Sequence, residues 1–261
     1  MLNYSKIKRS LLNFDQKLWK IYLKSLKNGQ REGFKVFLSS LEEFRLLGGQ
    51  VNNYYPILDE FDQAAGTADS DYFHQDLIVA QEIYSRNPAS HFDIGGRIDG
   101  FVAHVASFRE IQVLDIRQLQ NTSHPNIRFR QIDFFLEDLS EITDSVSCLH
   151  TIEHFGLGRY GDKLNPQGHK DGFKKLLGML KPGGILYVSF PISNSATLAF
   201  NAHRILEPRE LLDWLLSEFN LVNFHFVNDS SELVRDWDLA SKLPQVKLGC
   251  GIYIVQRKVS L

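Results

Sequence analysis

Two histidines and a glutamate stand close together in the segment SCLHTIEHFGLGRYGD (147–162), where their types and spacing could do chemistry. His150, Glu153 and His154 spell H-x-x-E-H, the signature of a class of zinc metallopeptidases. That chemistry needs both imidazoles on one face of a sustained helix and a third ligand further along the chain. Here His150 ends an apolar stretch typical of a strand, and the glycine-rich run GLGRYG follows. A zinc hydrolase is therefore the less favoured interpretation, and no metal site is expected.

Three aspartates each close a stretch with the pattern of a short strand: Asp93 the first, Asp115 the second and Asp133 the third. Gly95 and Gly96 lie at the end of the first strand, where glycines let a ligand approach the backbone closely. An acid about twenty residues further on is placed to bind the hydroxyls of a ribose. A carboxylate at the third strand end can accept a hydrogen bond from an amine such as that of adenine. Each acid could instead cap a helix, but all three together favour a nucleoside-containing cofactor.

The glycine turn narrows the choice of cofactor. Residues 95–100 read GGRIDG, which does not match the G-x-G-x-x-G pattern of an NAD site. No Walker A sequence occurs either, so hydrolysis of nucleoside triphosphates has no support.

The elements that position these residues alternate between strand-like and helix-like stretches from residue 90 onward. This alternation predicts an α/β fold, a mostly parallel seven-stranded sheet with helices on both faces and ligands at the carboxyl ends of its strands. The predicted strands are 91–96, 111–117, 127–134, 145–150, 185–191, 221–227 and 251–258. The predicted helices are 100–108, 171–180 and 207–219, with a Pro-Gly-Gly turn at 182–184.

The N-terminal region has a different pattern. Residues 6–47 repeat apolar side chains at helical spacing, with lysines on the other faces and Gly29 and Gly33 dividing the region. We expect a helical N-terminal cap packed on the main domain. The alternative is a basic amphipathic helix that makes peripheral membrane contact through residues 1–30. The predicted domains are 1–50 (helical cap), 51–89 (lead-in loop and helix) and 90–261 (the α/β domain).

Composition excludes several classes of protein. Of the 29 Lys and Arg residues, seven lie in residues 1–30 beside one acid, which leaves 22 basic against 30 acidic residues in the body. An acidic body gives no support to nucleic-acid binding. Cys148 and Cys250 are far apart and form no CxxC pair, so we expect a reducing, cytoplasmic setting. No run of 18 apolar residues occurs, and the charged N-terminus does not resemble a signal peptide.

The stretches FDIGGRIDGFVAHVASF, VLDIR, LHTIEHFGLGRYGD and LKPGGILYVSFP resemble class I S-adenosylmethionine-dependent methyltransferases over residues 70–210. More narrowly, they resemble a bacterial domain-of-unknown-function family linked to surface-polysaccharide synthesis. The resemblance implies a Rossmann-like fold, S-adenosyl-L-methionine as cofactor, and a sugar oxygen or sugar-linked phosphate of a small-molecule or lipid-linked glycan as acceptor. Arg97 and Asp99 stand where further glycines of the first motif would fall. This departure keeps open a non-catalytic cofactor-binding or scaffold protein.

The resemblance also implies roles for single residues. Methyl transfer to a hydroxyl needs a base and an acceptor held in line with the methyl group. The implied base is His154, with Glu153 orienting it or binding acceptor hydroxyls. The implied cofactor contacts are Asp93, Gly95 and Gly96 at the methionine part, Asp115 at the ribose, Asp133 at the adenine, His150 through its backbone, and Tyr72 and Gln75 closing over the cofactor. The candidate acceptor contacts are Tyr160, Asp162, His203 and Arg204. Ordinary packing, turns or structural hydrogen bonds are the alternative for each of them.

Overall fold

A computed structural model describes residues 15–120 and 124–259. The chain divides into two compact units, of which the first ends at Thr67 and the second begins at Ala68. This division falls between the predicted boundaries at 50 and 89, which stay predictions. No helix in the described part of the chain is long and apolar enough to cross a membrane.

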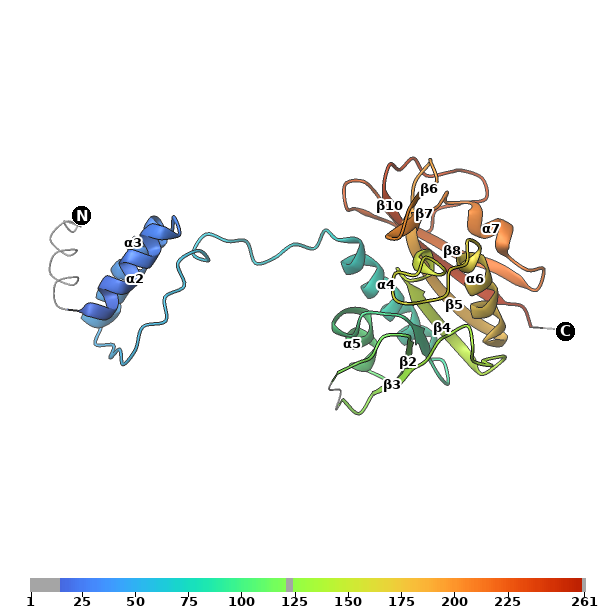
Figure 1. Cartoon of the computed structure of the whole chain (residues 1–261), viewed down its shortest axis with the longest axis horizontal. Coiled ribbons are helices and arrows are strands. Elements are labelled where there is room, and N and C mark those ends of the chain that lie inside the picture. Colours follow the sequence, from blue (N-terminus) through green and yellow to red (C-terminus); the bar gives the residue numbers. More distant parts are fainter. Residues whose placement is uncertain (1–14, 121–123, 260–261) are drawn as a thin grey trace. The chain divides into compact units, whose positions relative to one another are not determined.

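The first unit contains the helices α2 (Gln16–Lys27) and α3 (Arg31–Leu46), drawn in blue in Figure 1. The predicted helical region 6–47 is thus two helices, and its first part, residues 6–14, lies outside the described residues. Gly29 separates the two helices at φ 72°. Gly33 does not divide the region as expected but lies inside α3. Glycine is needed there because a Cβ would meet the carbonyl oxygen of Leu58 at 1.6 Å.

The second unit is built on an eight-stranded sheet, in the order β3-β2-β1-β4-β5-β10-β8-β9. The first five of these strands run parallel, while β10 lies antiparallel between β5 and β8. The prediction of a mostly parallel α/β sheet is confirmed, with one short edge strand, β9, beyond the seven expected. The strands are β1 (Phe92–Ile94), β2 (Ile111–Asp115), β3 (Ile127–Gln131), β4 (Thr143–Leu149), β5 (Leu180–Ile192), β8 (Phe219–Val227), β9 (Leu233–Val234) and β10 (Gly249–Arg257).

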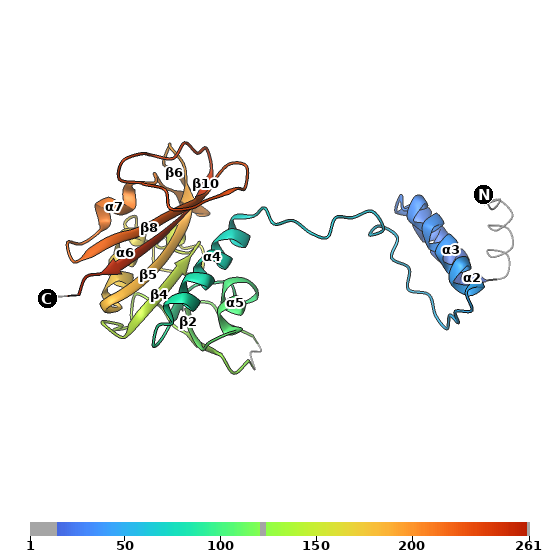
Figure 2. The same ribbon diagram turned by 180° about the vertical axis from the view of Figure 1, so that it is seen from behind.

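Helices cover both faces of this sheet, as Figures 1 and 2 show from opposite sides. One apolar core joins the sheet to α6 (Gly168–Gly178) and α7 (Glu210–Trp214). The other joins it to α4 (Asp71–Arg86), the π-helical turn η1 (Ile98–Val102) and α5 (Ala103–Ala106). Two cores on a shared sheet give the three-layer arrangement that the alternating pattern predicts.

Two local predictions are wrong. The helix expected over 207–219 ends at Trp214, because Leu215 turns to an extended conformation and Phe219 enters β8 opposite Arg257. The sequence also did not predict a hairpin of β6 (Thr197–Ala199) and β7 (His203–Ile205). The early end of α7 arises from the pairing of β8 with the distant strand β10, which overrides local helical preference. The β6–β7 hairpin is a local pairing of two three-residue strands.

Candidate active site

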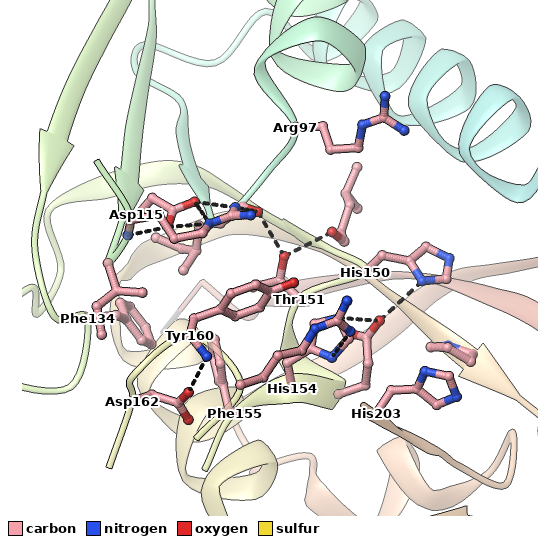
Figure 3. Close-up of a pocket in the computed structure, with 18 of the residues that line it drawn as sticks. Arg97, Asp115, Phe134, His150, Thr151, His154, Phe155, Tyr160, Asp162 and His203 are labelled. Carbon is pink, nitrogen blue, oxygen red and sulfur yellow. Dashed lines mark hydrogen bonds and ion pairs between the residues drawn. The ribbon is translucent and has the colours of Figure 1, made fainter. Parts of the chain in front are cut away.

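A cavity of about 510 Å³ lies at the carboxyl ends of β1, β2, β4 and β5, where sheets of this topology bind ligands (Figure 3). Its volume is within the range of roughly 300–1,000 Å³ typical of small-molecule sites. Ten of the sequence-predicted site residues line it: Tyr72, Gly95, Asp115, Asp133, His150, Glu153, His154, Tyr160, Asp162 and His203. Four others do not: Gln75, Asp93, Gly96 and Arg204.

Asp93 shapes the glycine turn instead of facing the cavity. Its side chain is fully buried, accepting hydrogen bonds from the Gly96 N–H at 2.9 Å and the Ser147 hydroxyl at 2.5 Å. Burial raises the pKa of Asp93 to about 7, although these hydrogen bonds oppose the shift. Gly95 adopts φ 72°, and a Cβ there would lie 2.5 Å from the side chain of Thr151. The turn therefore needs glycine at 95 for both its conformation and its close contact.

Asp115 ends β2 in the cavity wall, but its carboxylate is already paired. Arg117 Nε donates to both carboxylate oxygens at 2.9 and 3.1 Å, and Nη2 donates to Oδ2 at 2.5 Å. Nη2 also donates to the Gly95 carbonyl at 3.2 Å, and the guanidinium lies 4.8 Å from the ring centre of Tyr160. Because the Arg117 side chain is 46% exposed, it can move into solvent if a ligand displaces it from Asp115.

Asp133 stands beside an apolar wall of the cavity. Its Oδ1 accepts a hydrogen bond from the Phe135 N–H at 2.9 Å, and among the described residues Oδ2 accepts none. Phe134 and Phe135 line the same wall, and both rings pack against Phe155. A free carboxylate oxygen beside aromatic rings suits a flat ring that carries an exocyclic amine.

His150 leaves β4 in the left-handed region, at φ 46°. Its N–H donates to the Ser189 carbonyl and hydroxyl at 3.1 and 3.0 Å, and its ring lies 4.9 Å from that of Tyr72. Burial lowers the pKa of His150, but Cys250 and Glu153 raise it by more, to well above its usual value. Gln75 is buried and accepts a hydrogen bond from the hydroxyl of Ser189, which itself bonds His150. Gln75 therefore holds the end of β5 in position and does not close over the cavity.

Glu153 lies between the two histidines of the H-x-x-E-H segment. Its Oε1 is 3.2 Å from His150 Nδ1 and 3.6 Å from His154 Nε2, and its buried Oε2 has no hydrogen-bond partner among the residues that the structure describes. His154 Nδ1 donates to the Ala202 carbonyl at 2.7 Å, which leaves Nε2 as the acceptor nitrogen of a neutral ring. The orientation of His154 therefore comes from Ala202, whereas the hydrogen bond of Glu153 is to His150.

The glycine loop after His154 is fixed by Asp162. Its Oδ2 accepts hydrogen bonds from the N–H groups of Gly156 and Gly158 at 2.8 and 3.3 Å, and its Oδ1 accepts one from Tyr160 at 3.2 Å. These bonds make Asp162 a loop-shaping residue with little capacity left for an acceptor. Two guanidinium groups lie close to the Tyr160 ring, with Arg117 at 4.8 Å and Arg159 at 5.2 Å from the ring centre.

His203 and Arg204 separate in the structure although they are neighbours in sequence. His203 lines the cavity from β7, while Arg204 points the other way and is 5% exposed. Arg204 donates to the carbonyls of Glu153, Phe155 and Pro166 at 3.2, 2.7 and 3.3 Å. Arg204 therefore holds the chain around the glycine loop in place, and an acceptor in the cavity does not reach it.

Sequence reasoning does not single out three cavity-lining arginines, Arg97, Arg117 and Arg159. Arg117 follows the strand-end acid Asp115 by two residues, and Arg159 lies in the glycine loop. Their position in the sequence next to predicted site residues could have indicated that they line the site. Within the described chain, no three His, Cys, Asp or Glu side chains are grouped so that they could hold a metal ion. The H-x-x-E-H residues lie on a strand end and a 3-10 turn, Ile152–His154, so the helix that a zinc site of this class needs is absent from that segment.

Residues 108–247 match the model of a family described as "Caenorhabditis protein of unknown function, DUF268". This description names neither a bacterial group nor polysaccharides, so it does not support the link to surface-polysaccharide synthesis. No curated protein matches the sequence.

Solved structures share the fold. The 1,6-didemethyltoxoflavin-N1-methyltransferase of Burkholderia thailandensis is 15% identical with a TM-score of 0.51, over 70% of this chain and 78% of that chain. An O-methyltransferase of a Brevibacillus brevis multienzyme is 12% identical with a TM-score of 0.50, over 72% of each chain. Both contain S-adenosylhomocysteine. The [4+2]-cyclase SpnF is 14% identical with a TM-score of 0.52, over 88% of this chain and 97% of that chain. The predicted Rossmann-like methyltransferase fold is thus confirmed, but a cyclase among these neighbours means that the fold alone does not determine the reaction.

Proposed function

The chain belongs to the DUF268 family, and from its cavity we propose that it is an S-adenosylmethionine-dependent methyltransferase. One observation carries the proposal. Gly95, Asp115 and Asp133, at or just after the ends of successive strands, line one cavity of about 510 Å³. This is the order in which an amino-acid part, a ribose and an adenine would follow one another along the sheet edge.

The cavity residues fit such a cofactor. Asp133 has an oxygen that accepts no hydrogen bond from the described residues and is available for the adenine amine, and Phe134 supplies an apolar wall for the ring. Asp115 can bind the ribose hydroxyls once Arg117, which is half exposed, withdraws from its carboxylate. When bound, S-adenosylmethionine supplies an electrophilic methyl group on its sulfonium.

The histidine beside the glycine loop can take a proton from the acceptor. Burial lowers the pKa of His154, and although Glu153 opposes this shift, nearby cations add to it. His154 is therefore neutral near pH 7, with Nε2 available to accept a proton. Once His154 is protonated, the carboxylate of Glu153 at 3.6 Å stabilises the imidazolium. Glu153 thus stabilises the protonated form of His154, and the Ala202 carbonyl sets the orientation of the His154 ring.

The acceptor that we propose is a hydroxyl of a sugar, or a sugar-linked phosphate, on a small-molecule or lipid-linked glycan. Support for this class comes from the sequence resemblance in the first motif and the glycine loop. Tyr160 and His203 line the cavity and remain the proposed acceptor contacts.

A non-catalytic protein of the same fold is the second candidate. The observation that favours it is Arg117, which bonds both oxygens of Asp115 and so occupies the position proposed for the ribose. In the scaffold form of this alternative, the arginine would not withdraw and the cofactor would not bind; in its cofactor-binding form, the cofactor would bind but no acceptor would be methylated.

Calorimetry with S-adenosylmethionine separates the methyltransferase from a scaffold that does not bind the cofactor. We expect the wild-type protein to bind and Asp115→Asn to weaken binding roughly 10- to 100-fold, because hydrogen bonds to a charged group contribute about 1.5–3 kcal/mol. The matched control is Asp213→Asn, which removes an exposed carboxylate that does not line the cavity. Absence of binding by the wild-type protein would refute the cofactor proposal.

A further inference from the structure

Two guanidinium groups near the glycine loop have no carboxylate partner among the described residues. Arg204 is buried behind the loop and bonds only to backbone carbonyls. Arg159 lines the cavity, where Nη1 donates to the Ala202 carbonyl at 2.9 Å. Because arginine stays charged in proteins, this region holds two fixed positive charges, one of them shielded from solvent.

The acids that face this region are committed elsewhere. Glu153 is 3.2 Å from His150 Nδ1, and its charge is balanced when that ring is protonated. Asp162 accepts three backbone hydrogen bonds within the loop. Counting Arg159 and Arg204 against Asp162 leaves an excess of positive charge at this end of the cavity.

Two histidines extend the same cluster. The side chain of His154 is in contact with Arg159, whose Nη1 lies 3.3 and 3.4 Å from the two ring nitrogens. His203 lines the cavity from β7 on the same side, away from Asp115, as Figure 3 shows. Burial is the main cause that lowers the pKa of His154, and the charges of Arg159 and His203 lower it further.

We propose that Arg159 and His203 form an oxyanion subsite, next to His154, that binds a phosphate or carboxylate group of the acceptor. A guanidinium binds either group through paired, charge-assisted hydrogen bonds, and Arg159 has donors beyond the one that Ala202 accepts. The buried Arg204 adds a positive potential that solvent screens little. The two ends of the cavity then differ in charge: acids that would bind the nucleoside lie at one end, and groups that would bind an anion lie at the other. The role as acceptor subsite rests on the proposed function.

Histidine NMR with simple anions tests the subsite without an acceptor. The full-length protein is labelled at the histidine rings and titrated with inorganic phosphate, and separately with acetate, at constant ionic strength. We expect saturable shifts of the His154 and His203 resonances, assigned through His154→Gln and His203→Gln. Arg159→Gln should weaken the better-bound anion roughly tenfold, and Arg159→Lys should restore part of the affinity. The stronger of the two anions identifies the group on the acceptor.

Lys163→Gln is the matched control, because it removes one positive charge from the same loop at a side chain that does not line the cavity. No saturable shift with either anion, or equal weakening by Lys163→Gln and Arg159→Gln, would overturn the subsite. Calorimetry with S-adenosylmethionine on the same samples keeps the two proposals separate. Anion binding without cofactor binding would remove the acceptor role but leave the anion site, whereas the reverse would remove only the subsite.

Discussion

At the residue scale, the titration of His154 tests the proposed base. Burial lowers its pKa below the usual 6.5, Glu153 opposes this, and Arg159 adds to it. We expect the His154 ring resonance to titrate with a midpoint below pH 6.5, so that the base form is present throughout the neutral range. Arg159→Gln should raise that midpoint, and Lys163→Gln should change it less. A wild-type midpoint above 6.5 would contradict the assignment of His154 as a neutral base.

Asp93 provides a second prediction at this scale. Burial raises its pKa to about 7 in the folded protein, against 3.8 for an unperturbed carboxyl. Between pH 3.8 and pH 7 the folded state therefore binds more protons than the unfolded state. The free energy of unfolding falls as the pH rises toward 7 and levels off above pH 7. In urea unfolding, the stability of the wild type relative to Asp93→Asn should fall by about 3 kcal/mol between pH 5 and pH 8. A difference that does not change with pH would show that Asp93 ionises normally.

At the element scale, Arg204 connects β7 to the chain around the glycine loop. Arg204→Met would leave the carbonyls of Glu153, Phe155 and Pro166 without this donor. We expect a loss of about 3 kcal/mol in the free energy of unfolding and faster hydrogen exchange over residues 153–166. Arg209→Met is the matched control, because Arg209 also donates to two carbonyls but is partly exposed, so water can replace it. Equal losses for the two variants would rule out a special role for the buried contact.

At the scale of the whole molecule, the two compact units should respond separately to mutation. Gly33 lies in α3 with the Leu58 carbonyl where a Cβ would be, and the core of the first unit is small. We expect Gly33→Val to lower the midpoint temperature of the thermal transition of the first unit, or to abolish that transition. The transition of the second unit and the binding of S-adenosylmethionine should stay unchanged. Val36→Ala, at an exposed position of the same helix, should change neither transition appreciably. Loss of cofactor binding in Gly33→Val would show that the second unit depends on the first.

The exposed side chains of α2 also bear on the predicted membrane contact through residues 1–30. Within the described part, α2 exposes Trp19 and Leu23 and carries lysines at 17, 20, 24 and 27. This pattern is compatible with an anionic surface, and the contact stays a prediction because residues 1–14 lie outside the described chain.

The sequence by itself determined the mostly parallel sheet, the seven strands that were predicted and the edge at which the cavity lies. Alternating apolar stretches fixed the strands, and parallel strands joined by helices place their carboxyl ends on one edge. Asp115, Asp133, His150 and His154 were therefore predictable as neighbours, although they are far apart in the chain. The physical reason is that hydrophobic periodicity is a local property of a sequence, and a helix that connects two strands of one sheet makes them run parallel.

Only the tertiary structure decided what each polar side chain does at that edge. Asp93 bonds to Ser147 and withdraws from the cavity, Arg117 pairs with Asp115, and Arg204 is buried against Phe155. The early end of α7 likewise depends on the pairing of β8 with β10. These outcomes depend on which distant groups meet and on how much water remains around them. Neither burial nor a partner 50 residues away in the chain can be deduced from the spacing of residues alone.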